Sequence, residues 1–101
     1  MKINKEKMYI IRTYSAGVWF GNISEIENTT VVVTNARRLW YWSGAASLSQ
    51  LATEGTKRPN DCKFTVTITD KEGVLLTQVI EILPCTNEAV ENIKSVKEWK
   101  I

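Results

Sequence analysis

The sequence predicts an α+β fold: a curved antiparallel β-sheet, or a small barrel-like meander, of about five strands with two short helices. Three observations favour this class. β-Branched and aromatic residues recur in five short runs, and short turn-like segments separate most of these runs. The strand–helix–strand alternation of a parallel sheet is missing. At 101 residues, the chain is expected to form a single domain over residues 1–101.

The first three strands are expected at residues 8–14, 18–26 and 30–35. Gly17 relaxes the steric limits of the first connection, and Gly21 indicates a bend inside the second strand. Three short strands joined by tight turns form an antiparallel meander.

The next elements are a helix over residues 43–54 and two further strands. Ser43 or Ser47 can cap the helix at its start, and Gly55 is well placed to end it. The run Phe64–Thr69 alternates strictly and is the clearest strand signal in the chain. A hairpin turn at residues 70–73 leads from it into the last strand, residues 74–83.

A second helix is expected to begin with Thr86 as its N-cap. Val90, Ile93 and Val96 form its buried stripe at helical spacing. The tail that follows contains Trp99. Because an exposed indole at a chain end is unusual, the tail is expected to cover the sheet edge or to pack on a neighbouring subunit.

Residues 35–48 carry the strongest functional signal, with two adjacent arginines, three consecutive aromatic residues and a run of small residues. Arginine grips phosphate with a planar fork, and an indole offers a face on which a base or a guanidinium can stack. Small residues allow close approach of a ligand to the backbone, and a helix N-terminus attracts anions. The candidate ligand-binding residues are therefore Arg37, Arg38, Trp40, Trp42, Ser43, Gly44 and Ala45.

The facing of these side chains depends on whether strand alternation continues beyond Val33. If it does, Arg37 and Arg38 lie on opposite faces. Asn35, Leu39 and Tyr41 would then share the face of Arg37, and Trp40 and Trp42 that of Arg38. The alternative is a strand-to-helix junction whose tryptophans fill the core and whose arginines extend to solvent.

Catalysis is not expected. The chain has no histidine, the commonest general base, and no phosphate-binding or dinucleotide-binding motif. Cys62 and Cys85 lie far apart in the sequence with no further ligand to complete a zinc site, so neither a metal nor a cofactor is expected. The net charge of +2 is too small to name nucleic acid as the partner, although nucleic acid remains possible.

The expected location is the cytoplasm, with reduced thiols. The first residues lead into a strand rather than into a long apolar run, so no signal peptide is expected. Charged or strongly polar residues interrupt every apolar stretch, so no membrane segment is expected either.

Three segments together resemble a family of small phage and prophage proteins of unknown function. They are residues 9–18, the central N-A-R-R-L-W-Y-W-S-G-A-A-S-L-S-Q-L-A, and residues 77–84. The resemblance extends from about Tyr9 to Trp99, and residues 65–73 depart from it as a longer, more regular hairpin. It implies an accessory phage protein in the cytoplasm of the infected bacterial host, and it supplies no mechanism.

The setting and the residues together suggest a protein that counters host defence. Such proteins can sequester nucleotide immune signals, for example cyclic ADP-ribose variants or cyclic oligonucleotides. We therefore expect a non-catalytic homo-oligomer that holds a small phosphate-bearing nucleotide, since four tryptophans are a large load for one small domain to bury. The alternatives are a nucleic-acid-binding phage protein and a structural or host-protein-binding module that uses its tryptophans as anchors.

Overall fold

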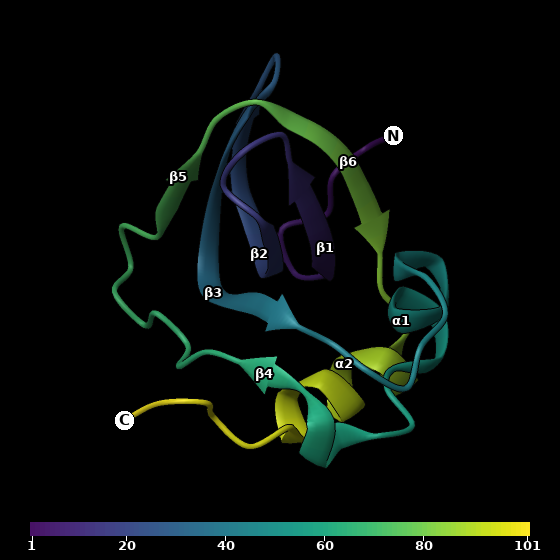
Figure 1. Cartoon of the computed structure of the whole chain (residues 1–101). Coiled ribbons are helices and arrows are strands. Elements are labelled where there is room, and N and C mark those ends of the chain that lie inside the picture. The colour runs from purple at the N-terminus through teal and green to yellow at the C-terminus, as the bar shows by residue number, and fades with distance from the viewer.

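The computed structural model describes all 101 residues and contains one six-stranded sheet with two α-helices (Figure 1). The sheet order is β4-β3-β2-β1-β6, with β5 also paired to β3, and every strand pair is antiparallel. The predicted α+β class with a curved antiparallel sheet is confirmed, and the sheet is not closed. The strands are β1 (Met8–Thr13), β2 (Val18–Glu27), β3 (Thr30–Tyr41), β4 (Lys63–Phe64), β5 (Val74–Leu76) and β6 (Val79–Pro84). The helices are α1 (Leu48–Glu54) and α2 (Asn87–Ser95), with a 3₁₀ turn at Pro59–Asp61.

The β1–β2–β3 meander is present as predicted, but β3 is longer than expected. It continues through the two arginines to Tyr41 instead of ending at Asn35. A bulge divides it, because Phe20 pairs with Arg37 whereas Asn22 pairs with Thr34, so that two residues of β3 stand opposite Gly21. Asn35 takes a left-handed φ of 51° in this bulge, a conformation that asparagine tolerates.

Gly21 makes the bulge possible. A Cβ atom there would lie 2.6 Å from the side chain of Val33 and 2.7 Å from the carbonyl of Thr34. Only glycine leaves room for β3 to approach this closely. The bend expected inside the second strand stays a prediction, since the irregularity at this point is the extra residue of β3 and β2 is regular through Gly21.

The predicted strand Phe64–Thr69 is wrong in its extent, since only Lys63–Phe64 is regular. Beyond it, single hydrogen bonds tie the chain to β3, from Thr65 N to Arg38 O and from Ile68 N to Ala36 O. The bulge in β3 breaks the edge on which a regular ladder would form. The side chain of Arg37 also donates hydrogen bonds to the main-chain carbonyls of Phe64 and Thr65.

The predicted hairpin at residues 70–73 is also corrected. A turn is present, with Gly73 N bonded to Asp70 O at 3.0 Å. The segments on its two sides do not pair with each other, because both lie along the same edge of β3. Residues 64–76 therefore run antiparallel along one edge of β3, and the middle of this segment turns away from that edge. We call this middle part the excursion.

The predicted final strand, residues 74–83, is two strands. Gln78 has a left-handed φ of 57° and separates β5 on β3 from β6 on β1, so the chain crosses from one edge of the sheet to the other (Figure 1). This crossing gives the sheet its barrel-like curvature without closing it.

Helix α1 is shorter than predicted and begins after Ser47, whose side chain accepts a hydrogen bond from Gln50 N at 3.2 Å. It ends at Gly55, which has φ +80°, as predicted. Helix α2 begins after Thr86, the predicted N-cap, and Ile93 and Val96 of its predicted stripe are buried while Val90 is half-buried.

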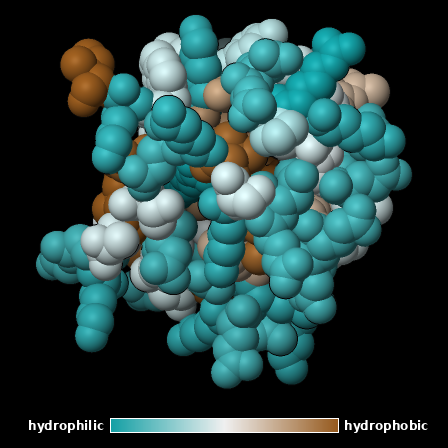
Figure 2. All heavy atoms as spheres, turned by 90° about the horizontal axis from the view of Figure 1, so that it is seen from below, coloured by the Kyte–Doolittle hydropathy of each residue, from teal (hydrophilic) through white to brown (hydrophobic).

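Two hydrophobic clusters occupy opposite faces of the sheet, as the alternation of Ile10 and Ile11 in β1 shows. The helix-side cluster includes Ile10, Phe20 and Leu51, and the other includes Ile11, Val33 and Leu76. Viewed from below, mainly hydrophilic side chains cover the molecule, with small apolar areas between them (Figure 2). Neither helix is long and apolar enough to cross a membrane.

Candidate functional site

The seven predicted binding residues do not converge on one site. Arg37 lies on the helix-covered face of β3, whereas Arg38 and Trp40 lie on the opposite face. Residues 42–45 form part of the connection to α1. The structure therefore divides the predicted segment among three places.

Arg37 is buried, with 3% of its surface exposed, and its guanidinium donates to main-chain carbonyls. Nε bonds Thr65 O at 2.7 Å, and Nη1 bonds Ile93 O at 2.7 Å. Nη2 bonds Val96 O at 2.5 Å and Phe64 O at 3.4 Å. Four of its five N–H groups are thus used to hold β4 and the end of α2 against β3.

Arg38 lies between two indoles. Alternation along β3 predicted two indoles on its side, but only one of the two is the residue expected. Its Cζ atom is 5.3 Å from the ring centroid of Trp19 and 5.4 Å from that of Trp40. The second indole was expected to be Trp42. A register shift between Leu39 and Tyr41 instead turns Trp42 toward the helix-side cluster.

The main chain of Ser43 and Gly44 contacts a neighbouring loop. Ser43 N donates to Cys62 Sγ at 3.4 Å, and Ser43 O accepts a bond from the Thr56 hydroxyl. Gly44 O accepts a bond from Lys57 N at 3.0 Å. Because α1 begins at Leu48, the free N–H groups of a helix start do not lie at these residues.

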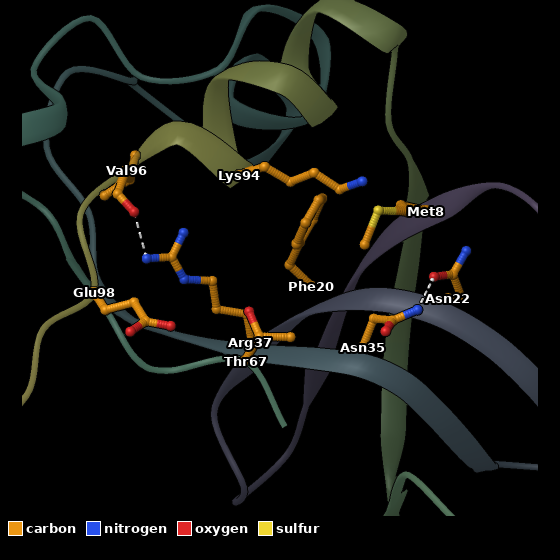
Figure 3. A pocket seen from close by; sticks show the side chains of 9 residues that line it. All are labelled: Met8, Phe20, Asn22, Asn35, Arg37, Thr67, Lys94, Val96 and Glu98. Carbon is orange, nitrogen blue, oxygen red and sulfur yellow. Dashed lines mark hydrogen bonds between the residues drawn. The ribbon is translucent and has the colours of Figure 1, made fainter. Parts of the chain in front are cut away.

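An open cavity of about 340 Å³ lies beside Arg37 on the helix-covered face (Figure 3). Its lining side chains come from β1, β2, β3, α2 and the segments that follow β4 and α2. Figure 3 shows Lys94 extending from α2 across the cavity toward Met8. The apolar lining residues are Met8, Phe20 and Val96, and the polar ones are Asn22, Asn35, Arg37, Thr67, Lys94 and Glu98.

A second open cavity, of about 570 Å³, adjoins the first. Met8, Asn22 and Lys94 line both cavities, so the two lie side by side between α2 and the start of β1. We call these two adjoining cavities the α2 groove. The second cavity adds Glu6, Lys7, Cys85, Thr86, Asn87 and Val90 to its lining.

Two asparagines form an amide pair in the floor of the α2 groove. Asn35 Nδ2 donates to Asn22 Oδ1 at 3.0 Å, and Asn22 Nδ2 donates to Lys7 O at 2.9 Å. Oδ1 of Asn35 accepts no hydrogen bond within the chain, so an acceptor is free at the groove surface. The bulge at Gly21 places these two amides beside Arg37 on one face.

The charge of Arg37 is not neutralised by an ion pair. Burial lowers the pKa of Arg37, and the negative charge of Glu98 opposes that shift. Glu98 also lines the cavity but lies beyond ion-pair distance from Arg37, and it pairs with Lys100 at 3.4 Å. Lys94 makes no ion pair. The α2 groove therefore has three cationic side chains outside any ion pair, those of Arg37, Lys94 and Lys7. Its lining is mixed polar and apolar, an arrangement that suits a small anionic ligand.

The sequence reasoning missed Lys94, Asn22 and Asn35. No motif connects them, because they come from three elements and meet only through the fold. The one available signal was Asn35, a turn-forming residue inside a β-branched run. The structure contains no group of three or more histidine, cysteine or acidic side chains arranged to hold a metal ion.

Comparison with protein families gives one match. A family model described as a domain of unknown function (DUF6948) matches residues 6–93. The matched range contains Met8, Asn22, Asn35 and Arg37 of the α2 groove and ends one residue before Lys94. No curated protein and no solved structure matches the chain.

Proposed function

The chain belongs to the DUF6948 family of unknown function, and we propose that it binds a phosphate-bearing nucleotide in the α2 groove without converting it. The observation that carries the proposal is an open cavity of mixed polar and apolar lining with two cationic side chains outside any ion pair, Arg37 and Lys94. Small-molecule sites are typically clefts of this size in which a few polar groups converge.

Each part of the α2 groove fits one part of a nucleotide. The thioether of Met8, which is 8% exposed, offers a small apolar contact for a base, and the buried ring of Phe20 packs behind it. The free Oδ1 atom of Asn35 can accept a hydrogen bond from a base N–H group. Lys94 is exposed at the groove and can pair with a phosphate.

In this proposal, Arg37 attracts the ligand mainly through the electrostatic field of its charge rather than by direct hydrogen bonds. Four of its N–H groups are occupied, so at most one is free for a ligand. Its buried charge still raises the potential of the cavity, where the low local dielectric strengthens electrostatic attraction. This use of Arg37 differs from the direct phosphate grip that the sequence suggested.

Binding without turnover is favoured because the chain has no histidine. Glu6 and Glu98 are the carboxylates that line the groove, and Glu98 is already paired with Lys100. The proposed setting is the cytoplasm of a phage-infected bacterium, where the protein would sequester a host immune signal of the cyclic nucleotide or cyclic ADP-ribose class.

Titration calorimetry tests this proposal with cyclic dinucleotides, cyclic ADP-ribose isomers and linear nucleotides. We expect one of these to bind, and Lys94→Ala to weaken its binding about tenfold, or ~1.4 kcal/mol, because a charge-assisted contact is lost. Lys71→Ala removes an exposed lysine outside the groove and should leave affinity unchanged.

Two outcomes would contradict the proposal. The first is that none of these nucleotides binds, or that Lys94→Ala and Lys71→Ala bind equally well. The second concerns turnover: the ligand should be recovered chemically intact when the complex is heated. An altered ligand would make the protein an enzyme.

A further inference from the structure

The face of β3 opposite the α2 groove carries a row of stacked indoles and cations. Arg38 lies between Trp19 and Trp40, and Trp40 stacks on Trp99 with ring centroids 5.9 Å apart and an angle of 24° between the planes. Lys63 Nζ lies 5.5 Å from the centroid of Trp99. We call these five residues, Trp19, Arg38, Trp40, Trp99 and Lys63, the tryptophan ladder.

The ladder is held at both ends by main-chain contacts. At one end, the carbonyl of Ala16 accepts bonds from the Arg38 guanidinium and from Trp19 Nε1, the latter at 3.0 Å. At the other end, Trp99 N donates to Phe64 O at 2.8 Å, so the tail lies along β4. The indoles are therefore positioned before any partner arrives.

Much of the ladder faces solvent. Trp40 is 57% exposed and Trp99 is 45% exposed, and the neighbouring Tyr41 and Val66 are also exposed. Large aromatic side chains usually bury more of their surface within a chain of this size. A contiguous exposed group of this kind indicates an interaction surface.

The charges beside the tryptophan ladder indicate the chemical class of its partner. Trp99 lines an open hollow of about 300 Å³ together with Lys97, Lys100 and Glu98, and Lys63 stands on its ring. Cations outnumber the single carboxylate, so a second copy of this chain would bring like charges together. A partner with planar groups and regularly spaced negative charges meets both the indoles and the lysines.

We infer that the tryptophan ladder binds single-stranded nucleic acid: Lys63 moves from the outer face of Trp99 to a phosphate, and a base stacks on that face in its place. Lys97 lies beside the same hollow and pairs with a neighbouring phosphate. Proteins that bind single strands without sequence preference combine aromatic platforms with a basic track in this way. The track is short, so it fits a few nucleotides. This inference is independent of the nucleotide proposal, because the α2 groove lies on the other face of β3.

Fluorescence anisotropy with a labelled oligothymidylate of about 12 nucleotides tests the inference. Trp40→Ala and Trp99→Ala should each weaken binding about tenfold or more, because Trp99 is the stacking platform and Trp40 supports its inner face. Lys63→Ala should weaken binding and lower the slope of log affinity against log salt by about one. Folding of each variant is checked by circular dichroism, since the replaced side chains are about half exposed or more.

The controls separate this surface from the rest of the molecule. Leu75→Ala removes an exposed apolar side chain on β5, and Lys71→Ala removes an exposed charge, and neither should change the affinity. Lys94→Ala in the α2 groove should not change it either. A duplex of the same length should bind more weakly, because its bases are not free to stack on indoles.

Three results would overturn the inference. One is that the single strand does not bind at low salt. Another is that binding is unchanged in folded Trp40→Ala and Trp99→Ala variants. The third is a wild-type dimer by light scattering that Trp99→Ala converts to a monomer, because the ladder would then be a contact between two copies of this chain.

Discussion

Two adjacent arginines serve opposite faces of one strand. Arg37 points to the helix side and ties β4 and α2 to β3 through main-chain carbonyls. Arg38 points to the other side and lies between Trp19 and Trp40. Side chains of neighbouring residues in a strand alternate, so a pair that resembles one phosphate clamp in the sequence cannot act as one here.

Arg37→Ala should lower the free energy of unfolding by about 3 kcal/mol or more, because several buried carbonyls lose their donor. Arg37→Lys keeps the charge but loses the planar fork, so it should also destabilise the protein. Urea denaturation measures both. Arg12→Ala is the matched control and should cost less than about 1 kcal/mol, because Arg12 makes an exposed ion pair with Glu81 at 3.0 Å. Equal effects at the two positions would contradict the structural role of Arg37.

Burial raises the pKa of the Cys85 thiol to about 12. We therefore expect iodoacetamide to alkylate Cys85 far more slowly in the native protein than in urea at about pH 8, because the thiolate is the reactive form. The folded-state pKa lies above the unfolded one, so the stabilising contribution is complete below about pH 9 and is lost as the pH rises toward 12. Cys85→Ala should show a smaller loss of stability over that range. Equally fast alkylation of native and unfolded protein would contradict this.

At the scale of elements, the edge of β3 determines how the second half of the chain folds. Residues 64–76 run antiparallel along this edge but leave it in the middle, where the bulge at Asn35 interrupts the ladder. The bulge brings Asn35 to the α2 groove, and Thr67 reaches the groove from the segment just before the excursion. The irregularity of β3 is thus part of how the cavity is formed.

Amide hydrogen exchange tests this account of the edge. Val66 N and Thr67 N donate no hydrogen bond and should exchange fast, whereas Thr65 N and Ile68 N, which bond to β3, should exchange more slowly. Amides in the centre of β2 and β3 should be slowest. Uniformly slow exchange across residues 64–69 would mean that the continuous strand predicted from the sequence forms after all.

Local signals in the sequence were sufficient for the elements whose causes are local. Ser47, Gly55 and Thr86 were predicted as helix ends and act as such, because a cap is a contact within one turn. The run Phe64–Thr69 alternates like a strand, yet its partner strand is bulged, and that information lies about thirty residues away. The α2 groove could not be predicted, since its lining comes from segments far apart in the sequence that only the fold brings together.

At the scale of the whole molecule, the tryptophans show how much of its aromatic surface a single chain buries. Trp19 and Trp42 are half-buried against the two hydrophobic clusters, whereas Trp40 and Trp99 cover each other only in part. The tail lies along β4, one of the two positions expected for it. The homo-oligomer expected from the aromatic content stays a prediction, and light scattering at tens of micromolar, about the range where moderate dimers form, is its measurement.

The central claim is that β3 separates two binding surfaces, a nucleotide groove on the side of Arg37 and a single-strand surface on the side of Arg38. Titration of the ¹⁵N-labelled protein followed by NMR tests it most directly. A cyclic dinucleotide should shift the side-chain amides of Asn22 and Asn35 and leave the indole N–H signals of Trp40 and Trp99 in place. An oligothymidylate should do the reverse. If both ligands shift the same set of signals, or if neither shifts its own, the division of this strand into two binding faces is wrong.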